Sequence, residues 1–221
     1  MARENWTKLS LLADSVRPMT RLSAFSFALL TGALASLFTL ALAFGGQDNA
    51  LDRALLAAMQ FPALVPAARL VTRLGDWWAY LPLGGAAAAW LLWRGRTRHA
   101  LLLAALLLSE RLLVTLLKLL FARARPDPAG HLDFTYTLSF PSGHATNAMT
   151  LGLGAALLLA PGKGRGLPLA LGLLFAFLVG ATRPLLGVHW PSDVLGGWAL
   201  GALWTLLLLR LAAGTSSTHP H

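Results

Sequence analysis

Long apolar runs dominate this sequence and most constrain what the chain can fold into. Six stretches can be read as membrane spans, and they cover residues 22–44, 77–93, 100–121, 143–160, 167–186 and 192–211. A helix needs about 20 mostly apolar residues to cross a bilayer. Charged residues make up 12% of the chain, against roughly 25% in soluble domains. The sequence therefore predicts an all-α, polytopic membrane protein with six transmembrane helices in one bundle.

The regions outside these runs suggest three parts and one extra helix. We expect a cytoplasmic N-terminal segment at 1–21, a six-helix transmembrane domain at 22–211 and a flexible cytoplasmic tail at 212–221. Between the first two spans, Leu51 and Leu55 recur at helical spacing, with Asp52 and Arg53 opposite them. This pattern predicts an amphipathic helix that either lies on the membrane surface or packs on the bundle.

The charge distribution sets the expected orientation. The net charge is +9, a balance that would also suit a nucleic-acid binder. Here, however, the basic residues lie in short loops between apolar runs, so we expect no nucleic-acid partner. Basic loops at 94–98 and 163–165 place themselves and both termini in the cytoplasm by the positive-inside rule. The three polar motifs described next then face the periplasm or the cell exterior, in a bacterial inner membrane.

The first motif consists of Lys118 and Arg125-Pro126, where the third span ends. Arginine presents a planar fork to phosphate oxygens, and lysine presents a point charge. The alternative is that these side chains snorkel to lipid headgroups. That alternative suits Arg123, to which we assign no role in a site.

The second motif is Pro141-Ser142-Gly143-His144, which opens the fourth span. Free backbone N–H groups at a helix N-terminus bind anions. Gly143 lets an anion approach the backbone closely, and Ser142 adds a hydroxyl donor. An ordinary helix N-cap would use the same residue types.

The third motif is Thr182-Arg183, followed by His189 and then Asp193 at the start of the sixth span. A carboxylate that binds one imidazole nitrogen fixes the tautomer and leaves the other nitrogen free to attack. The alternative is a histidine that caps a helix at the membrane interface. The chain has no cysteine, which excludes a thiolate nucleophile and a disulfide.

The three motifs together have the composition of a phosphoryl-transfer site. Such a transfer needs cations and N–H donors around the phosphate oxygens, and Lys118, Arg125 and Arg183 supply three cations. No acidic cluster suits magnesium, so we expect neither a metal nor a cofactor. His189 is then the nucleophile that forms a phosphohistidine, and His144 is the general acid and base.

The same motifs resemble the three signatures of the type 2 phosphatidic acid phosphatase (PAP2) family. They match as Lys118-x6-Arg125-Pro126, as Pro141-Ser142-Gly143-His144 and as Arg183-x5-His189-x3-Asp193. The third signature usually opens with Ser-Arg, whereas this chain has Thr182, which keeps the hydroxyl. The resemblance implies a six-helix bundle, a phosphohistidine on His189 and no metal.

The resemblance also implies a lipid phosphate or diphosphate substrate that arrives from the bilayer. We favour undecaprenyl diphosphate or phosphatidylglycerophosphate. The alternatives are a lipid A phosphatase or a lipid-to-lipid phosphotransferase, which would share the motifs, and a non-catalytic lipid transporter. The sequence leaves the oligomeric state open.

Two further features lie inside the predicted spans. Glu110 and Arg111 fall in the middle of the third span, where each charge costs about 2.5–3.5 kcal/mol on insertion scales. We expect a structural ion pair involving Glu110 or another carboxylate, in preference to a role of Arg111 in a substrate tunnel or proton path. Gly197 and Gly201 have the GxxxG spacing of helix contacts, which we expect to serve packing inside the bundle rather than a dimer.

Overall fold

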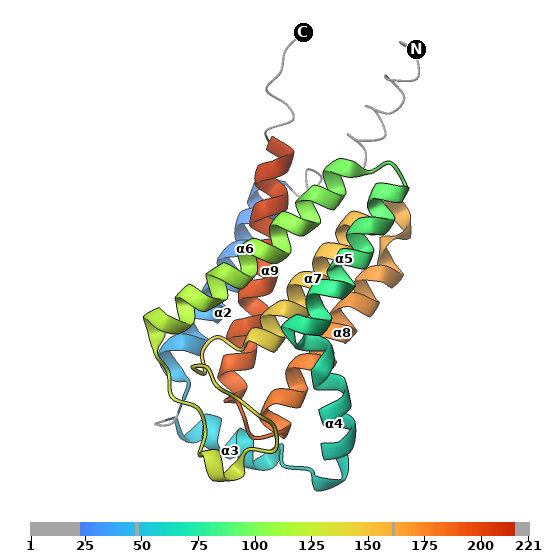
Figure 1. Ribbon diagram of the computed structural model, residues 1–221. Coiled ribbons are helices and arrows are strands. Elements are labelled where there is room, and N and C mark those ends of the chain that lie inside the picture. The colour runs from blue at the N-terminus through green and yellow to red at the C-terminus, as the bar shows by residue number, and fades with distance from the viewer. Residues whose placement is uncertain (1–22, 47–48, 161, 215–221) are drawn as a thin grey trace, which may run out of the picture.

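The computed structural model is a bundle of long helices with shorter helices at one end (Figure 1). It describes residues 23–46, 49–160 and 162–214. The helices are α2 (Ala24–Phe44), α3 (Ala50–Ala58), α4 (Val65–Thr72), α5 (Trp77–Trp93), α6 (Thr97–Phe121), α7 (Gly143–Leu159), α8 (Gly166–Leu185) and α9 (Pro191–Gly214). Short 3₁₀ turns join some of them, and the described residues contain no strand. The all-α prediction is confirmed for this part of the chain.

The predicted spans coincide with helices, but not all of these helices are long enough to be candidate spans. By length and composition, the candidates are α2, α6, α8 and α9. A fifth would arise if α3 and Pro62–Gly75, which are bent by 67° to each other, formed one broken span. α5 and α7 have 17 residues each. The protein is therefore a multi-pass membrane protein with four or five candidate spans. The predicted segment 1–21 and the tail from residue 215 lie outside the described residues.

A close contact between α7 and α9 brings two of the motifs together. A Cβ at Gly197 would lie 2.7 Å from the Ser142 carbonyl, and one at Gly201 would lie 2.8 Å from the Thr146 carbonyl. Glycine at both positions therefore lets the two helices approach closely, as small residues do in membrane proteins. The prediction that these glycines pack inside the bundle is confirmed. At the end of this contact, the Ser142 N–H donates to the Asp193 carbonyl at 3.0 Å.

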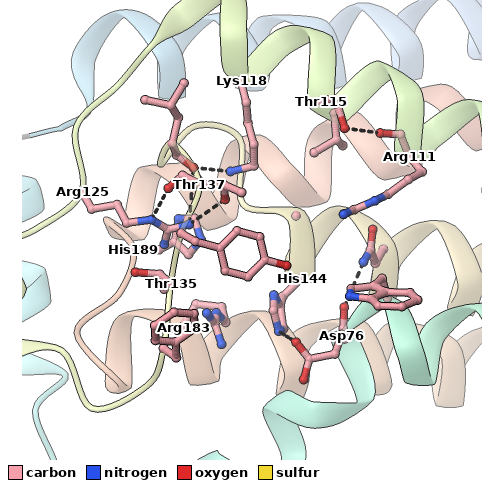
Figure 2. Close-up of a pocket in the computed structure, with 18 of the residues that line it drawn as sticks. Asp76, Arg111, Thr115, Lys118, Arg125, Thr135, Thr137, His144, Arg183 and His189 are labelled. Carbon is pink, nitrogen blue, oxygen red and sulfur yellow. Dashed lines mark hydrogen bonds and ion pairs between the residues drawn. The ribbon is translucent and has the colours of Figure 1, made fainter.

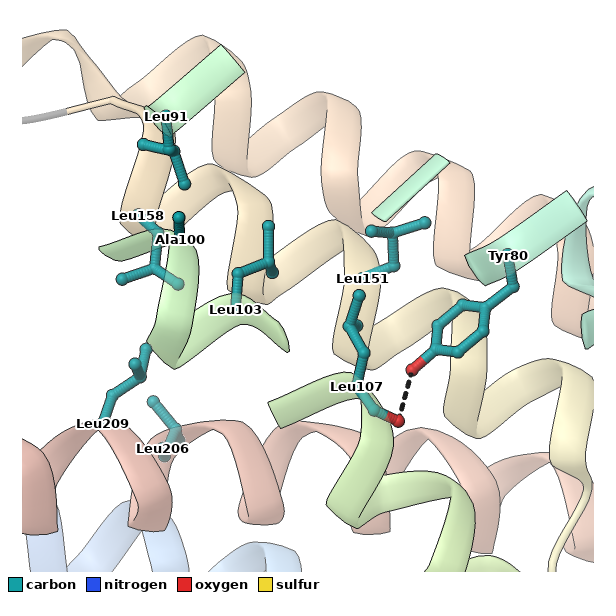
Figure 3. Packing of buried hydrophobic residues seen from close by; sticks show 9 residues of the cluster. All are labelled: Tyr80, Leu91, Ala100, Leu103, Leu107, Leu151, Leu158, Leu206 and Leu209. Atoms are coloured by element: carbon teal, nitrogen blue, oxygen red, sulfur yellow. Dashed lines mark hydrogen bonds between the residues drawn. The ribbon is translucent and has the colours of Figure 1, made fainter. Parts of the chain in front are cut away.

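An apolar cluster fills the bundle between α5, α6, α7 and α9 (Figure 3). Leu103 and Leu107 of α6 meet Leu151 of α7 there, and Leu206 of α9 closes the other side. Lipid tails are as apolar as leucine, so van der Waals packing holds such helices together in a bilayer. The polar site is thereby confined to the end of the bundle where α7 and α9 begin.

Helix α3 forms where the amphipathic pattern predicts it, but Asp52 does not lie on an outward polar face. Asp52 is 4% exposed, and its carboxylate accepts from the Ser192 N–H at 2.9 Å and from the Gly46 N–H at 2.6 Å. The Ser192 hydroxyl donates to it as well. Free N–H groups at the start of a helix attract a carboxylate, so Asp52 is turned towards the first turn of α9.

Candidate active site

One cavity of about 340 Å³ lies where α5, α6 and α7 meet the loop after α6. Such a volume falls at the lower end of the range for small-molecule sites, roughly 300–1,000 Å³. Six of the predicted site residues line it: Lys118, Arg125, Gly143, His144, Arg183 and His189. Figure 2 labels five of them, all except Gly143, and shows their side chains converging from different elements. The other two, Ser142 and Asp193, are buried directly behind this lining.

His189 and Asp193 form the pair that the sequence predicts. His189 Nδ1 lies 3.2 Å from Asp193 Oδ2, and both side chains are buried. The turn before them needs Gly187, whose φ is +73° and where a Cβ would meet a loop carbonyl at 2.4 Å. Burial first, and then the charges of Arg125 and Lys118, hold the pKa of His189 well below its usual range. A neutral imidazole results, with Nε2 left to face the cavity.

Arg123 completes the surroundings of Asp193, and the prediction that it snorkels to headgroups is wrong. Its Nη1 donates to Asp193 Oδ1 at 2.9 Å, and its Nη2 donates to the Ala41 carbonyl at 2.9 Å. Helix α6 ends at Phe121, and its C-cap residue Ala122 has a left-handed φ of 47° that turns the chain back. This turn sends Arg123 over the bundle instead of towards the membrane surface. Ser139, also missed in the sequence, donates to Asp193 Oδ2 at 2.5 Å.

Lys118 and Arg125 both hold the loop that follows α6. Lys118 Nζ donates to the Leu138 carbonyl and, at 3.4 Å, to the Ser139 carbonyl. Arg125 Nε donates to the Thr137 carbonyl at 2.6 Å. Burial, followed by the nearby charge of Arg183, lowers the pKa of Arg125 to about 10. The guanidinium therefore stays charged at neutral pH, and the crowding of cations favours an anion in the cavity.

Arg183 reaches the cavity from the end of α8, which continues through Pro184 to Leu185. Its Nη1 donates to Asp133 Oδ2 at 2.7 Å and to Thr72 Oγ1 at 2.6 Å. Its Nε is buried without a hydrogen-bond partner among the described residues. The guanidinium thus keeps donor capacity for a ligand while Asp133 and Thr72 fix its position.

The start of α7 offers unused donors. Ser142 is the N-cap residue, yet its side chain makes no capping hydrogen bond. Its Oγ is buried and has no partner within the part of the chain that the structure describes. Because the first N–H groups of a helix also lack intrahelical partners, Ser142 and Gly143 together present an anion-binding end.

Asp76 lies beside His144, and its place in the site was not revealed by the sequence either. Asp76 Oδ1 and His144 Nε2 are 3.1 Å apart, with the geometry of an ion pair rather than of a well-aligned hydrogen bond. Burial acts to raise the pKa of Asp76, but the contact with His144 and the charge of Arg183 outweigh it, and the pKa is lowered. A carboxylate therefore stands against the ring that we assign as acid and base.

Two features hold the turn before Asp76 against the start of α7. A Cβ at Gly75 would lie 2.8 Å from His144 Cδ2, so glycine is needed for this approach. The Asn147 side chain, one turn along α7, donates to the Gly75 carbonyl at 2.9 Å. Asp76 lies far from His144 in the sequence, and no spacing could have linked the two.

The predicted ion pair of Glu110 with Arg111 does not form. Glu110 is buried and accepts from the Tyr80 hydroxyl at 2.9 Å, whereas Arg111 lines the cavity. Successive residues point about 100° apart around a helix of 3.6 residues per turn. Glu110 consequently faces the interior of the bundle, and Arg111 faces the site.

Comparison with known proteins identifies the family. The model of the PAP2 superfamily matches residues 98–215, which include all three motifs. The chain belongs to the PAP2 superfamily. Decaprenylphosphoryl-5-phosphoribose phosphatase of Mycobacterium tuberculosis is 38% identical over 152 residues, which cover 66% of this chain and 79% of that protein. Phosphatidylglycerophosphatase B of Bacillus subtilis is 34% identical over 166 residues, covering 73% and 81%.

The PAP2 fold is also seen in a solved structure. The crystal structure of a transmembrane PAP2 type phosphatidylglycerolphosphate phosphatase from Bacillus subtilis superposes with a TM-score of 0.78 at 29% identity. The match covers 86% of this chain and 98% of that one. The resemblance drawn from the motifs is thus confirmed, and the protein is a PAP2-type phosphatase. Asp76 lies outside the segment that the family model matches.

Proposed function

We propose that this PAP2 protein removes a phosphate group from a membrane lipid through a phosphohistidine on His189. The observation that carries the proposal is the buried His189–Asp193 pair, which faces three cations in one cavity of a membrane bundle. A neutral histidine suits nucleophilic attack, and the cations suit the charge that develops on the phosphate oxygens.

In the first step, the phosphate sits between the cationic side chains and the start of α7. His189 Nε2 forms the N–P bond while the P–O bond to the lipid breaks. His144 gives its proton to the leaving oxygen, so the lipid departs as a neutral alcohol, or as a phosphate when the substrate is a diphosphate. Asp193 stabilises the positive charge that forms on the His189 ring.

In the second step, water replaces the lipid. His144 now accepts a proton from the water, whose oxygen forms a bond to phosphorus while the N–P bond breaks. Inorganic phosphate leaves, and both histidines return to their starting states. These steps use the side chains and water, and we propose that no cofactor takes part.

We further propose six spans, formed by α2 and α5 to α9, within a phosphatase domain at 22–211. The N-terminal segment and the tail then face the cytoplasm, and the site faces the periplasm across a bacterial inner membrane. The basic loops at the far end support this orientation. Trp77 and Trp78, exposed at the start of α5 as in an interfacial belt, support a membrane boundary at that end of the bundle. Exposed Leu51 and Leu55 on α3 suit contact with the membrane surface.

The substrates that we favour are phosphatidylglycerophosphate and undecaprenyl diphosphate. The relatives reported above act, by their names, on lipids whose phosphate lies at the end of a headgroup. A lipid A phosphatase or a lipid-to-lipid phosphotransferase would use the same residues, with an acceptor lipid replacing water in the second case. A non-catalytic transporter would not need the oriented His189–Asp193 pair.

A phosphate-release screen with purified protein tests the proposal. Lipid phosphates and diphosphates are offered to the wild type, to His189→Ala and to His131→Ala, which changes another histidine of the same side. We expect release by the wild type and His131→Ala, and none by His189→Ala. A ³²P-labelled substrate should leave acid-labile, alkali-stable label on the wild type and on His131→Ala, but none on His189→Ala. Full activity of His189→Ala would refute the mechanism, and labelled acceptor lipid would identify a phosphotransferase.

A further inference from the structure

Arg111 places a charge in the middle of α6 that no carboxylate of the described residues balances. Among the residues that the structure describes, no carboxylate lies within 4.0 Å of its guanidinium. The backbone carbonyl of Arg111 accepts a hydrogen bond from the Thr115 hydroxyl at 2.9 Å. Ten residues separate it from the end of α6 at Phe121 and fourteen from the start at Thr97. A cation at such a depth is costly to insert into a bilayer, which calls for a compensating role.

Its position relative to the reaction centre suggests that role. Arg111 and Lys118 line the same cavity, and Figure 2 shows the Arg111 side chain extending into it, beside Thr115. Seven residues on one helix correspond to about 10 Å along the axis at 1.5 Å per residue. Arg111 is therefore displaced from Lys118 and His189 towards the middle of the span, which is the direction of the lipid tails.

A lipid headgroup in this cavity must follow the same order. Its apolar tail stays in the bilayer, and its terminal phosphate reaches His189 near the end of the bundle. Any other anionic group of the headgroup lies between these two points. Arginine suits a phosphate there, because its planar fork donates two parallel hydrogen bonds to the oxygens.

We infer that Arg111 binds a second, non-reacting phosphate of the substrate, between the apolar tail and the phosphate that His189 attacks. The inference rests on the proposed function and narrows it to lipids with two phosphate groups. Phosphatidylglycerophosphate has this form, with a phosphodiester, a glycerol spacer and a terminal phosphate. Phosphatidic acid has the terminal phosphate alone.

The test compares these two lipids with the same acyl chains, in the wild type, Arg111→Gln, Arg111→Lys and the control Arg94→Gln, which changes an arginine at the opposite end of α5. For Arg111→Gln we expect kcat/KM to fall about tenfold or more on phosphatidylglycerophosphate, equal to roughly 1.4 kcal/mol. On phosphatidic acid, kcat/KM of Arg111→Gln should differ from that of the wild type by less than about twofold. Arg111→Lys should retain part of the preference for phosphatidylglycerophosphate over phosphatidic acid, and Arg94→Gln should retain all of it.

Equal losses on both lipids, or no loss on either, would overturn the inference. A structural role would instead lower the thermal stability of Arg111→Gln, whereas loss of an unpaired charge should leave it unchanged or raise it. If the wild type hydrolyses neither lipid, turnover cannot test the subsite, and the proposed function fails if undecaprenyl diphosphate is left intact as well. The subsite is then decided by binding to His189→Ala, whose preference for the two-phosphate lipid must vanish when Arg111→Gln is added.

Discussion

Asp76 Oδ1 lies 3.1 Å from His144 Nε2, so each of the two histidines in the cavity has its own carboxylate. Asp193 faces the nucleophile, and Asp76 faces the acid and base. Gly75 and Asn147 hold the Asp76 turn in place. We therefore expect Asp76 to act as a positioning residue, which orients the ring of His144, the proposed acid and base.

Asp76→Asn should therefore slow the reaction according to how much the leaving group needs a proton. With an alkyl lipid phosphate we expect a loss of about 10- to 100-fold, which is part of the roughly 10²- to 10⁴-fold that a positioned acid usually contributes. With p-nitrophenyl phosphate, whose phenolate leaves unprotonated, the initial burst should change less than about threefold. Asp127→Asn, a loop carboxylate that caps a 3₁₀ turn, serves as the control. Equal losses with both leaving groups would mean that Asp76 only supports the fold.

Arg123→Gln should destabilise the protein and impair His189. The change leaves the buried Asp193 without the counter-charge now at 2.9 Å, and breaking a buried pair costs about 3–5 kcal/mol. Thermal unfolding in detergent measures the effect. In a double-mutant cycle with Asp193→Asn, the two losses should be far from additive. Additive losses would show that Arg123 acts mainly through the α2 carbonyls.

The lowered pKa of His189 makes the stability depend on pH. Below about 6.5 the unfolded chain protonates this histidine, whereas the folded protein keeps it neutral because of burial and the neighbouring cations. The unfolded state then binds more protons, so stability falls as the pH falls below 6.5. As the pH is lowered from 7.5 to 5.5, we expect the melting temperature of His189→Asn to rise relative to that of the wild type. A constant difference would contradict the lowered pKa.

The buried Tyr80–Glu110 contact should serve stability alone. Tyr80→Phe removes the donor at 2.9 Å and leaves the buried Glu110 carboxyl less satisfied, at a cost of about 1–3 kcal/mol. Turnover of the folded enzyme should stay within about twofold. A tenfold change in turnover would need a change of about 1.4 kcal/mol in the activation free energy. Tyr136→Phe changes an exposed tyrosine and should leave the melting temperature as it is. A turnover loss in Tyr80→Phe comparable to that of His189→Ala would show a catalytic link.

The sequence predicts best what short-range spacing encodes. His189 and Asp193 meet because His189 lies in the bend just before α9 and Asp193 lies in the first turn of that helix. Six residues of the three motifs line the cavity. The contacts of Asp193 with Arg123 and of His144 with Asp76 are tertiary, and they depend on helix ends that no spacing describes. The expected ion pair of Arg111 with Glu110 or another carboxylate does not form among the described residues, and for Glu110 the reason is that adjacent residues of a helix diverge. The outward placement of Asp52 failed since the start of α9 offered it donors.

The contacts of Arg123 determine which parts of the chain a fragment must contain to keep the site intact. Its guanidinium joins Asp193 of the last helix to the carbonyls of Ala41 and Leu42 near the end of α2. A fragment trimmed to residues 98–215 would keep every signature motif. It would nevertheless lose the anchor behind the nucleophile and the carboxylate beside His144. The signature motifs line the cavity, but the residues around them are also held by α2 and by the turn before α5.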